Sequence, residues 1–213
     1  MIYNIYKPKD FSSFSVVKQI KRITHEKVGH SGTLDPFADG VLILGVGKST
    51  KKLSDIIQYD KSYEGLIKLG EQTDTKDLTG SVINTQTVPN IKNIDLDAIV
   101  KSFLGIQMQD TPMYSARKVN GVRLYKLARK NISVKRNPKQ IDIKYLECRA
   151  IDDITLHIKV ECSSGTYIRV LAEDIAKKIG TIGHLTKLTR TTVGSFSLDE
   201  SLTVEKFEEE WKS

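Results

Sequence analysis

Apolar residues recur along the chain with two different spacings, which indicate helices and strands in irregular alternation. Five segments have the helical spacing of three or four residues: 14–26, 48–58, 96–104, 168–179 and 204–211. Two segments alternate apolar and polar residues as half-buried strands do: 63–69 and 154–161. The continuous apolar run 41–46 is typical of a buried strand. This order, without an internal repeat, predicts an α+β fold with a mixed, mostly antiparallel sheet flanked by helices.

Residues at the ends of these segments support the interpretation. Ser12 or Ser13 can cap the first helix, and Gly180 follows the fourth, at the place where a glycine commonly ends a helix. The stretch 110–140 is polar and contains Asn120-Gly121, a two-residue hairpin signal. We therefore expect an inserted arm at about residues 110–140.

Positive charge is concentrated in this arm. The chain has 33 Lys and Arg residues against 26 Asp and Glu, which gives a net charge of +7. Nine basic residues and no acidic residue lie from Arg117 to Lys139, so the rest of the chain is close to neutral. Such a segment favours a polyanionic partner, because solvated surfaces normally mix both signs; a merely solvated surface is the alternative. The residues that we expect to bind RNA are Lys118, Arg123, Lys126, Arg129, Lys130 and Arg136.

Composition narrows the class of protein further. The longest apolar run, 41–46, is far shorter than the ~20 residues of a membrane helix, and the N-terminus lacks the apolar core of a signal peptide. The two cysteines, Cys148 and Cys162, allow no disulfide framework, and the four histidines lack the spacing of metal ligands. We therefore expect a cytoplasmic protein with buried, reduced thiols, no metal and no membrane partner.

The segment from Gly29 to Gly40 contains the strongest candidate for chemistry. Its glycines let the backbone approach a ligand, and Pro36 favours an extended Asp35. A carboxylate just before a buried strand would be partly desolvated and would need a cation or hydrogen bonds. Arg169 is a candidate, because an arginine in the first turn of a helix opposes the helix dipole, and a buried carboxylate partner would explain it. Spacing alone does not pair Asp35 with Arg169, and an ordinary turn and an exposed arginine are the alternatives.

Six segments of the chain resemble, in order, motifs of the TruB family of tRNA pseudouridine synthases, which act on uridine 55. The segments are Lys7-Pro8, Gly29 to Pro36, Asp60 to Tyr63, Thr73 to Asp77, Pro112 to Lys118 and Gly165 to Arg169. The resemblance covers about residues 1–195. One such motif would be weak evidence, but six in the same order are specific.

The resemblance implies an isomerase that converts uridine 55 in the T arm of tRNA to pseudouridine. It implies that Asp35 is the nucleophile, which detaches uracil from its ribose before the ring is rejoined through carbon 5. It also implies that Arg169 pairs with Asp35 and that Tyr63 stacks on the base, which leaves its stack to react. Four residues are assigned to substrate binding by the same resemblance: His30, Tyr167, Leu188 and Lys7. No metal or cofactor is implied.

The resemblance also predicts the domain organisation. Residues 1–213 are expected to form a single catalytic domain of the pseudouridine-synthase fold, with the inserted arm and without the C-terminal PUA-type RNA-binding domain of many family members. We expect tRNA as the partner and a monomer. Two other hypotheses stay open: a non-catalytic module that binds RNA or helps tRNA to fold, which the basic arm favours, and a pseudouridine synthase acting on another RNA. The chain departs from the usual family residues at Asp10, Ser31 and Thr189.

Overall fold

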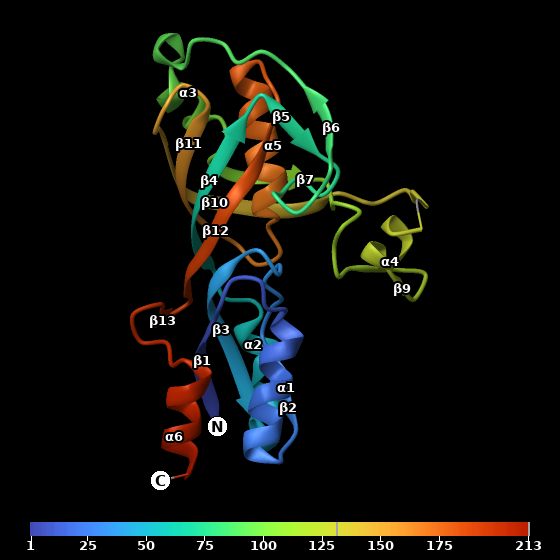
Figure 1. Cartoon of the computed structure of the whole chain (residues 1–213), viewed down its shortest axis with the longest axis vertical. Coiled ribbons are helices and arrows are strands. Elements are labelled where there is room, and N and C mark those ends of the chain that lie inside the picture. The colour runs from blue at the N-terminus through green and yellow to red at the C-terminus, as the bar shows by residue number, and fades with distance from the viewer. Residues whose placement is uncertain (131, 213) are drawn as a thin grey trace. The chain divides into compact units, whose positions relative to one another are not determined.

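The computed structural model describes residues 1–130 and 132–212 (Figure 1). The chain divides into two compact units, Met1–Glu64 with Lys187–Ser213 and Gly65–Thr186. Two strands, β4 (Lys61–Leu69) and β12 (Gly183–Val193), contribute residues to both units. Whether the two units act as one catalytic domain stays a prediction.

The first unit is built around β3 (Asp39–Val46), which is the buried strand predicted from the apolar run. β1 (Ile2–Lys7) and β2 (Val28–His30) pair with β3 in antiparallel orientation, and the second half of β12 pairs with it in parallel. The other elements are α1 (Ser13–Thr24), the 3-10 helix η1 (Gly47–Lys52), α2 (Leu53–Ile56), β13 (Phe196–Ser197) and α6 (Val204–Lys212). The single helix predicted over 48–58 is therefore divided between η1 and α2.

The apolar core of this unit lies where α1 and α6 meet β1 and β3. Ser12 begins α1, and its hydroxyl accepts a hydrogen bond from the Ser15 N–H at 3.0 Å, which confirms one of the two predicted caps. The buried side chains of this cluster are Ile5, Val16, Val17, Ile20, Leu42, Leu44, Val46 and Phe207. Each fully buried aliphatic side chain contributes roughly 1.5–3 kcal/mol to folding. The core thus fixes β3 and the loop that precedes it.

The second unit contains a sheet with the strand order β12-β4-β11-β10-β7. β10 (Lys139–Ala150) pairs antiparallel with both β11 (Thr155–Cys162) and β7 (Gly105–Gln109). The remaining elements are β5 (Glu71–Thr73), β6 (Val82–Thr85), the 3-10 helix η2 (Ile91–Asn93), α3 (Leu96–Lys101) and α5 (Ile168–Ile179). α5 has the bounds predicted from its periodicity, and Gly180 follows it with a left-handed φ of +94°.

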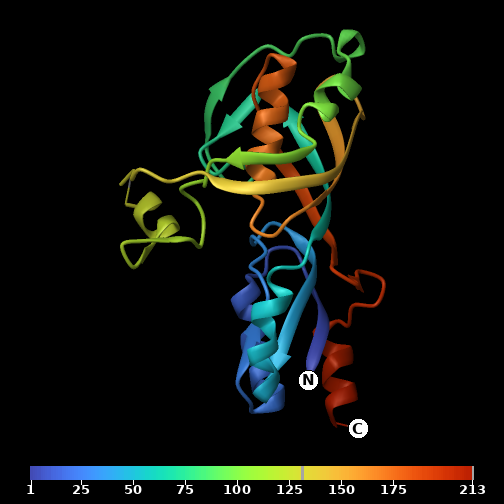
Figure 2. The same cartoon turned by 180° about the vertical axis from the view of Figure 1, so that it is seen from behind.

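The predicted arm is present between β7 and β10. β8 (Lys118–Val119) and β9 (Val122–Arg123) form a hairpin, and α4 (Leu124–Ala128) follows. Asn120 and Gly121 both have positive φ, 49° and 79°, as a two-residue hairpin turn requires. Figures 1 and 2 both show this arm to one side of the sheet of its own unit.

Two further expectations concern composition. Both cysteines are buried, as predicted, and burial raises the pKa of the Cys148 thiol to about 11. Within the part of the chain that the structure describes, no helix combines the length and the apolar character needed to cross a membrane.

Candidate active site

The loop that carries Asp35 connects β2 to β3, and Ser13 of α1 binds its backbone. Asp35 itself is half-buried. The buried Ser13 hydroxyl donates to the Leu34 carbonyl at 3.1 Å and accepts from the Leu34 N–H at 2.8 Å. The Ala38 N–H donates to the Asp35 carbonyl at 3.1 Å. The backbone is therefore fixed on both sides of the predicted nucleophile.

A buried lysine supports the same loop. Lys7 has no exposed surface, and its ammonium donates to three carbonyl oxygens, those of Pro8 at 2.9 Å, Phe11 at 2.6 Å and Pro36 at 3.4 Å. Burial lowers the pKa of Lys7 to about 8, although the nearby acidic charges, including Asp35, act in the opposite direction. Lys7 is therefore charged at neutral pH. Its ammonium contacts the carbonyl of Pro36, the residue that follows Asp35.

Arg190 is a second buried cation at this loop, and the sequence pattern did not predict it. Its Nε donates to the Val41 carbonyl at 2.7 Å and its Nη2 to the Gly32 carbonyl at 3.2 Å. The backbone of Arg190 also lies against Gly40, where φ is +109°. A Cβ added at Gly40 would be 2.8 Å from the backbone nitrogen of Arg190 and closer still to its carbonyl oxygen. One feature of the sequence could have indicated the burial of Arg190. In a strand, Arg190 faces the same side as Leu188, two residues earlier, and Leu188 is buried.

Three more predicted residues lie in the first unit. His30 ends β2 and is half-buried, and its Nδ1 accepts the Gly32 N–H at 3.2 Å, which leaves Nε2 to carry the proton of the neutral ring. Tyr63 is half-buried in β4. Leu188 is buried in β12. The first unit thus brings His30, Asp35, Tyr63, Leu188 and Lys7 together in one folded body.

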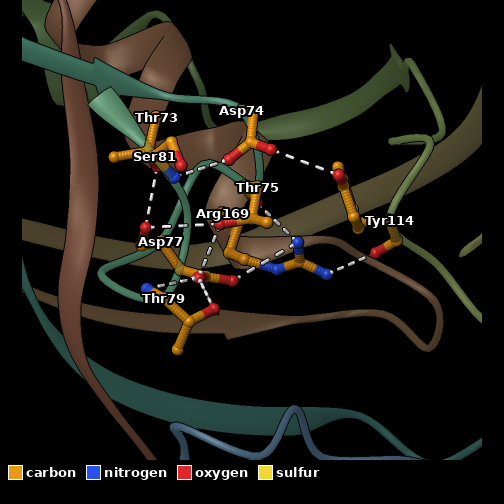
Figure 3. Close-up of polar contacts among 8 residues, drawn as sticks. All are labelled: Thr73, Asp74, Thr75, Asp77, Thr79, Ser81, Tyr114 and Arg169. Carbon is orange, nitrogen blue, oxygen red and sulfur yellow. Dashed lines mark hydrogen bonds and ion pairs between the residues drawn. The ribbon is translucent and has the colours of Figure 1, made fainter. Parts of the chain in front are cut away.

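Arg169 lies in the second unit, at the centre of a polar cluster shown in Figure 3. It occupies the first turn of α5 and is only 4% exposed. Its Nη1 donates to the Thr75 carbonyl and its Nη2 to the Tyr114 carbonyl, both at 2.7 Å. The guanidinium is therefore fixed between the turn after β5 and the start of the arm.

The buried carboxylate beside Arg169 in this unit is Asp77. Its Oδ2 lies 3.5 Å from Nη1 of Arg169. Its Oδ1 accepts the Thr79 N–H at 3.0 Å, the Thr79 hydroxyl at 2.6 Å and the Thr75 hydroxyl at 2.8 Å. Arg169 is therefore buried beside a carboxylate, and the alternative of an exposed arginine is wrong. Asp35 belongs to the other unit, and its pairing with Arg169 stays a prediction.

The cluster also includes the first residues of the arm. Tyr114 accepts from Arg169 through its carbonyl, and its hydroxyl donates to Asp74 at 3.1 Å. Asp74 also accepts the Ser81 N–H at 2.9 Å. Tyr167, the predicted base-pocket residue, lies directly before α5 and is half-buried.

The arm displays most of its predicted RNA-binding residues to solvent. Five of them, Lys118, Arg123, Lys126, Arg129 and Lys130, are exposed, and Arg136 is half-buried. The Arg129 guanidinium lies over the Tyr125 ring, 5.5 Å from its centre. Cationic groups on such a surface can contact phosphates without rearrangement of the core.

Comparison with known proteins identifies the family. Residues 19–168 match the model of the TruB family pseudouridylate synthase (N terminal domain), and residues 169–213 match that of the tRNA pseudouridylate synthase B C-terminal domain. A protein of Psychrobacter arcticus named tRNA pseudouridine synthase B is 46% identical over 208 residues, which cover 95% of this chain and 55% of the relative. A protein of the same name from Clostridium acetobutylicum is 43% identical over 210 residues, 98% of this chain and 72% of the relative.

Solved structures agree with this assignment. A chain in the crystal structure of a Cbf5-Nop10-Gar1 complex aligns with a TM-score of 0.74 and 28% identity, over 98% of this chain and 53% of that one. A chain in the structure of an H/ACA RNP bound to a substrate RNA containing 2′-deoxyuridine aligns with a TM-score of 0.70 and 26% identity, over 98% and 52%. The predicted α+β pseudouridine-synthase fold is confirmed. The chain spans little more than half of the length of the Psychrobacter relative and of these solved chains. On these matches, the chain belongs to the TruB family of pseudouridylate synthases.

Proposed function

We propose that this protein is a tRNA pseudouridine synthase, which isomerises uridine 55 in the T arm with Asp35 as the nucleophile. The observation that carries the proposal is the polar scaffold beneath the Asp35 loop, where Lys7 and Arg190 are both fully or nearly fully buried and bind loop carbonyls. Burial of a cation is costly unless hydrogen bonds compensate it. A loop held in this way supports a carboxylate in one fixed position, which nucleophilic catalysis requires.

The reaction is an isomerisation, so its atoms balance without another reactant. The bond between N1 of uracil and C1′ of the ribose breaks, and a bond between C5 and C1′ forms. The proton on C5 leaves, and N1 gains one. In this proposal Asp35 detaches the base, Arg169 orients Asp35, and Tyr63 stacks on the base and helps to move the proton. The isomerisation has no net change of oxidation state, so it requires no oxidant or reductant, and the proposal includes no cofactor or metal.

The substrate assignment rests on charge and on the relatives' names. The base must leave its stack to react, which costs a few kcal/mol, and phosphate contacts along the basic arm can offset part of that cost. His30, Leu188, Lys7 and Tyr167 would bind the flipped nucleotide or support its pocket. We propose tRNA as the partner of a monomeric protein in the cytoplasm, with no membrane partner.

A T-arm stem-loop RNA tests the proposal directly. Wild type, Asp35→Asn and Asp55→Asn are each incubated with this RNA, and pseudouridine is located by mass spectrometry after chemical derivatisation. Asp55 is exposed on α2, so its variant controls for the loss of one negative charge. We expect product at the T-loop uridine with wild type and Asp55→Asn, and none with Asp35→Asn. Product from Asp35→Asn would overturn the role of Asp35.

The exposed basic arm favours a second candidate, a module that binds RNA without modifying it. The same assay separates the two functions when binding is measured alongside product. Tight binding of the stem-loop by wild type, with no pseudouridine formed, would support the binding module. A ribosomal-RNA hairpin tested in parallel would reveal a synthase for another RNA.

A further inference from the structure

The two ends of the arm meet as strand partners at its base. The chain leaves the sheet at Gln109, the last residue of β7, and returns at Lys139, the first residue of β10. These two residues are directly paired in the antiparallel register. Both of their side chains bind the backbone of one turn, residues 163–167, which leads into α5. The base of the arm is therefore joined to the segment that carries Tyr167.

Gln109 binds both backbone polar groups of Tyr167. Its side chain is only 5% exposed. Its Oε1 accepts the Tyr167 N–H at 2.8 Å, and its Nε2 donates to the Tyr167 carbonyl at 3.1 Å. The side-chain amide of Gln carries a donor and an acceptor on one planar group, which matches the carbonyl and the N–H of Tyr167. The two bonds hold Tyr167 in an extended conformation, with φ of −98° and ψ of 104°.

Lys139 fixes the preceding part of the same turn. Its ammonium donates to the Ser164 carbonyl at 2.6 Å, and burial, together with the Arg117 charge, lowers the pKa of Lys139. Gly165 has a φ of +81°, and a side chain there would collide with the end of Lys139. The Thr166 hydroxyl closes the turn by donating to the Ser163 carbonyl at 2.9 Å. The turn is thus held at one end by Lys139 and at the other by Gln109.

A third connection joins the arm to the helix that begins after this turn. Arg169, two residues beyond Tyr167, donates to the carbonyl of Tyr114, which belongs to the arm. Displacement of the arm's base would therefore move the backbone of Tyr167 directly. Because the direction of a side chain follows from the backbone that carries it, this would also move the Tyr167 ring.

We propose that Gln109 is a positioning residue, which holds the Tyr167 ring in the orientation that binding of the target base requires. Together with Lys139, Gln109 couples the binding of RNA by the arm to the conformation of the base pocket. The inference rests on the proposed function for the identity of the base. It acts through the Tyr167 backbone, and Gln109 itself does not touch the RNA. Alignment of bound groups to within about 1 Å governs reaction rates, so a small shift of the ring has a large effect on turnover.

The direct test observes the Tyr167 ring. The protein is prepared with 3-fluorotyrosine at its eight tyrosines, and the Tyr167 signal is assigned by its loss in Tyr167→Phe. In Gln109→Glu the side chain keeps its size and one acceptor, but a second oxygen faces the Tyr167 carbonyl. We expect the fluorine signal of Tyr167 to shift or split in this variant. The matched control is Gln140→Glu, at an exposed position on the neighbouring strand β10, which should leave that signal unchanged.

A kinetic test separates positioning from binding. With a T-arm stem-loop, Gln109→Glu should retain the wild-type dissociation constant within about threefold and lose at least about tenfold in single-turnover rate. Lys139→Met removes the contact with the Ser164 carbonyl together with the ammonium charge, and leaves both Gln109 bonds in place. It should shift the same fluorine signal with a smaller loss of rate. It keeps the proposal testable if Gln109→Glu does not fold.

The outcomes distinguish this proposal from the proposed function. An unchanged Tyr167 signal in folded Gln109→Glu or Lys139→Met would overturn the positioning role, whether or not the wild type is active. A wild type that forms no pseudouridine would overturn the proposed function, while a shifted Tyr167 signal in the variant would still support the positioning of Tyr167 by Gln109. A loss of RNA affinity equal to the loss of rate would also contradict the proposal, because it would show that Gln109 acts on binding.

Discussion

Asp77 and Arg169 form a buried ion pair in the second unit, and exchange of one carboxylate oxygen of Asp77 for an amide nitrogen should disturb it strongly. Asp77→Asn keeps the size of the side chain and removes its charge. Oδ1 already accepts three hydrogen bonds from Thr75 and Thr79, so the amide oxygen of the variant would take that place. The new NH₂ group would then face the guanidinium, which sets a donor against a donor.

The size of the effect follows from the geometry. Two unit charges 3.5 Å apart interact by about 5 kcal/mol at an effective permittivity of 20. Removal of one member of a buried pair typically costs about 3–5 kcal/mol. Arg169 keeps two carbonyl acceptors at 2.7 Å, those of Thr75 and Tyr114, which favours the lower end of this range. We therefore expect Asp77→Asn to lose about 3 kcal/mol of the free energy of unfolding.

Urea unfolding measures this loss, with Asp74→Asn as the matched control. Asp74 lies three residues away in the same turn and is exposed, and its variant keeps an oxygen for the Ser81 N–H. We expect a loss of about 1 kcal/mol or less for the control. Equal urea midpoints for the two variants would refute the reasoning, because they would show that the charge of Asp77 contributes nothing to the stability of this cluster.

Three further predictions test other parts of the structure. Gly40→Ala should lower the melting temperature by about 10 °C, because its methyl group would collide with the Arg190 backbone. Gly105 also has a positive φ, +88°, but nothing among the described residues lies within 4 Å of an added Cβ, so Gly105→Ala has the backbone strain without the collision and should cost less; equal losses would contradict this reason. The pKa of Lys7, about 8 in the folded protein, lies below its unfolded value of 10.5, so the unfolded state binds more protons between these pH values and the free energy of unfolding should rise with pH there, by up to about 3 kcal/mol. Lys7→Met should reduce this rise in urea titrations from pH 7.5 to 10.5, while the contribution of Lys139, whose pKa is also lowered, remains; a rise of unchanged size would exclude Lys7 as a source. Because the pKa of Cys148 is raised to about 11, a thiol reagent at pH 8 should modify it at least about 100-fold more slowly in the folded than in the unfolded protein.

Local signals in the sequence predicted the elements whose pattern is unbroken. α5 combines a regular apolar face with Gly180 at its end, and both of its bounds were predicted. β10, the longest strand, was missed because its alternation changes phase. Ile141 and Ile143 are buried, but the next buried residue is Leu146, and the register with β11 shifts between Ile143 and Tyr145. A bulge of this kind divides one long alternation into two short ones.

The candidate site was predictable where a motif marks it and not where distant backbone completes it. The loop around Asp35 was expected, and the resemblance had assigned Lys7 to substrate binding, whereas the structure shows it buried and bound to backbone carbonyl groups of the loop and its neighbours. Arg190 and Gln109 were not expected, because each binds carbonyl or N–H groups far away in the chain, separated by 149 residues in the case of Arg190 and Val41. Asp77 lay within a recognised motif, but its place beside Arg169 follows from a turn of backbone that periodicity does not encode.

The central claim is that Asp35 performs the chemistry, and one comparison tests it most directly. Single-turnover rates of pseudouridine formation and dissociation constants are measured for wild type and Asp35→Asn on the same T-arm stem-loop. The account predicts that the variant binds the RNA within about threefold of wild type and forms no detectable product, a loss of at least about 10⁴-fold in rate. Comparable rates for the two proteins, or a wild type that binds the RNA and leaves its uridine unchanged, would contradict it.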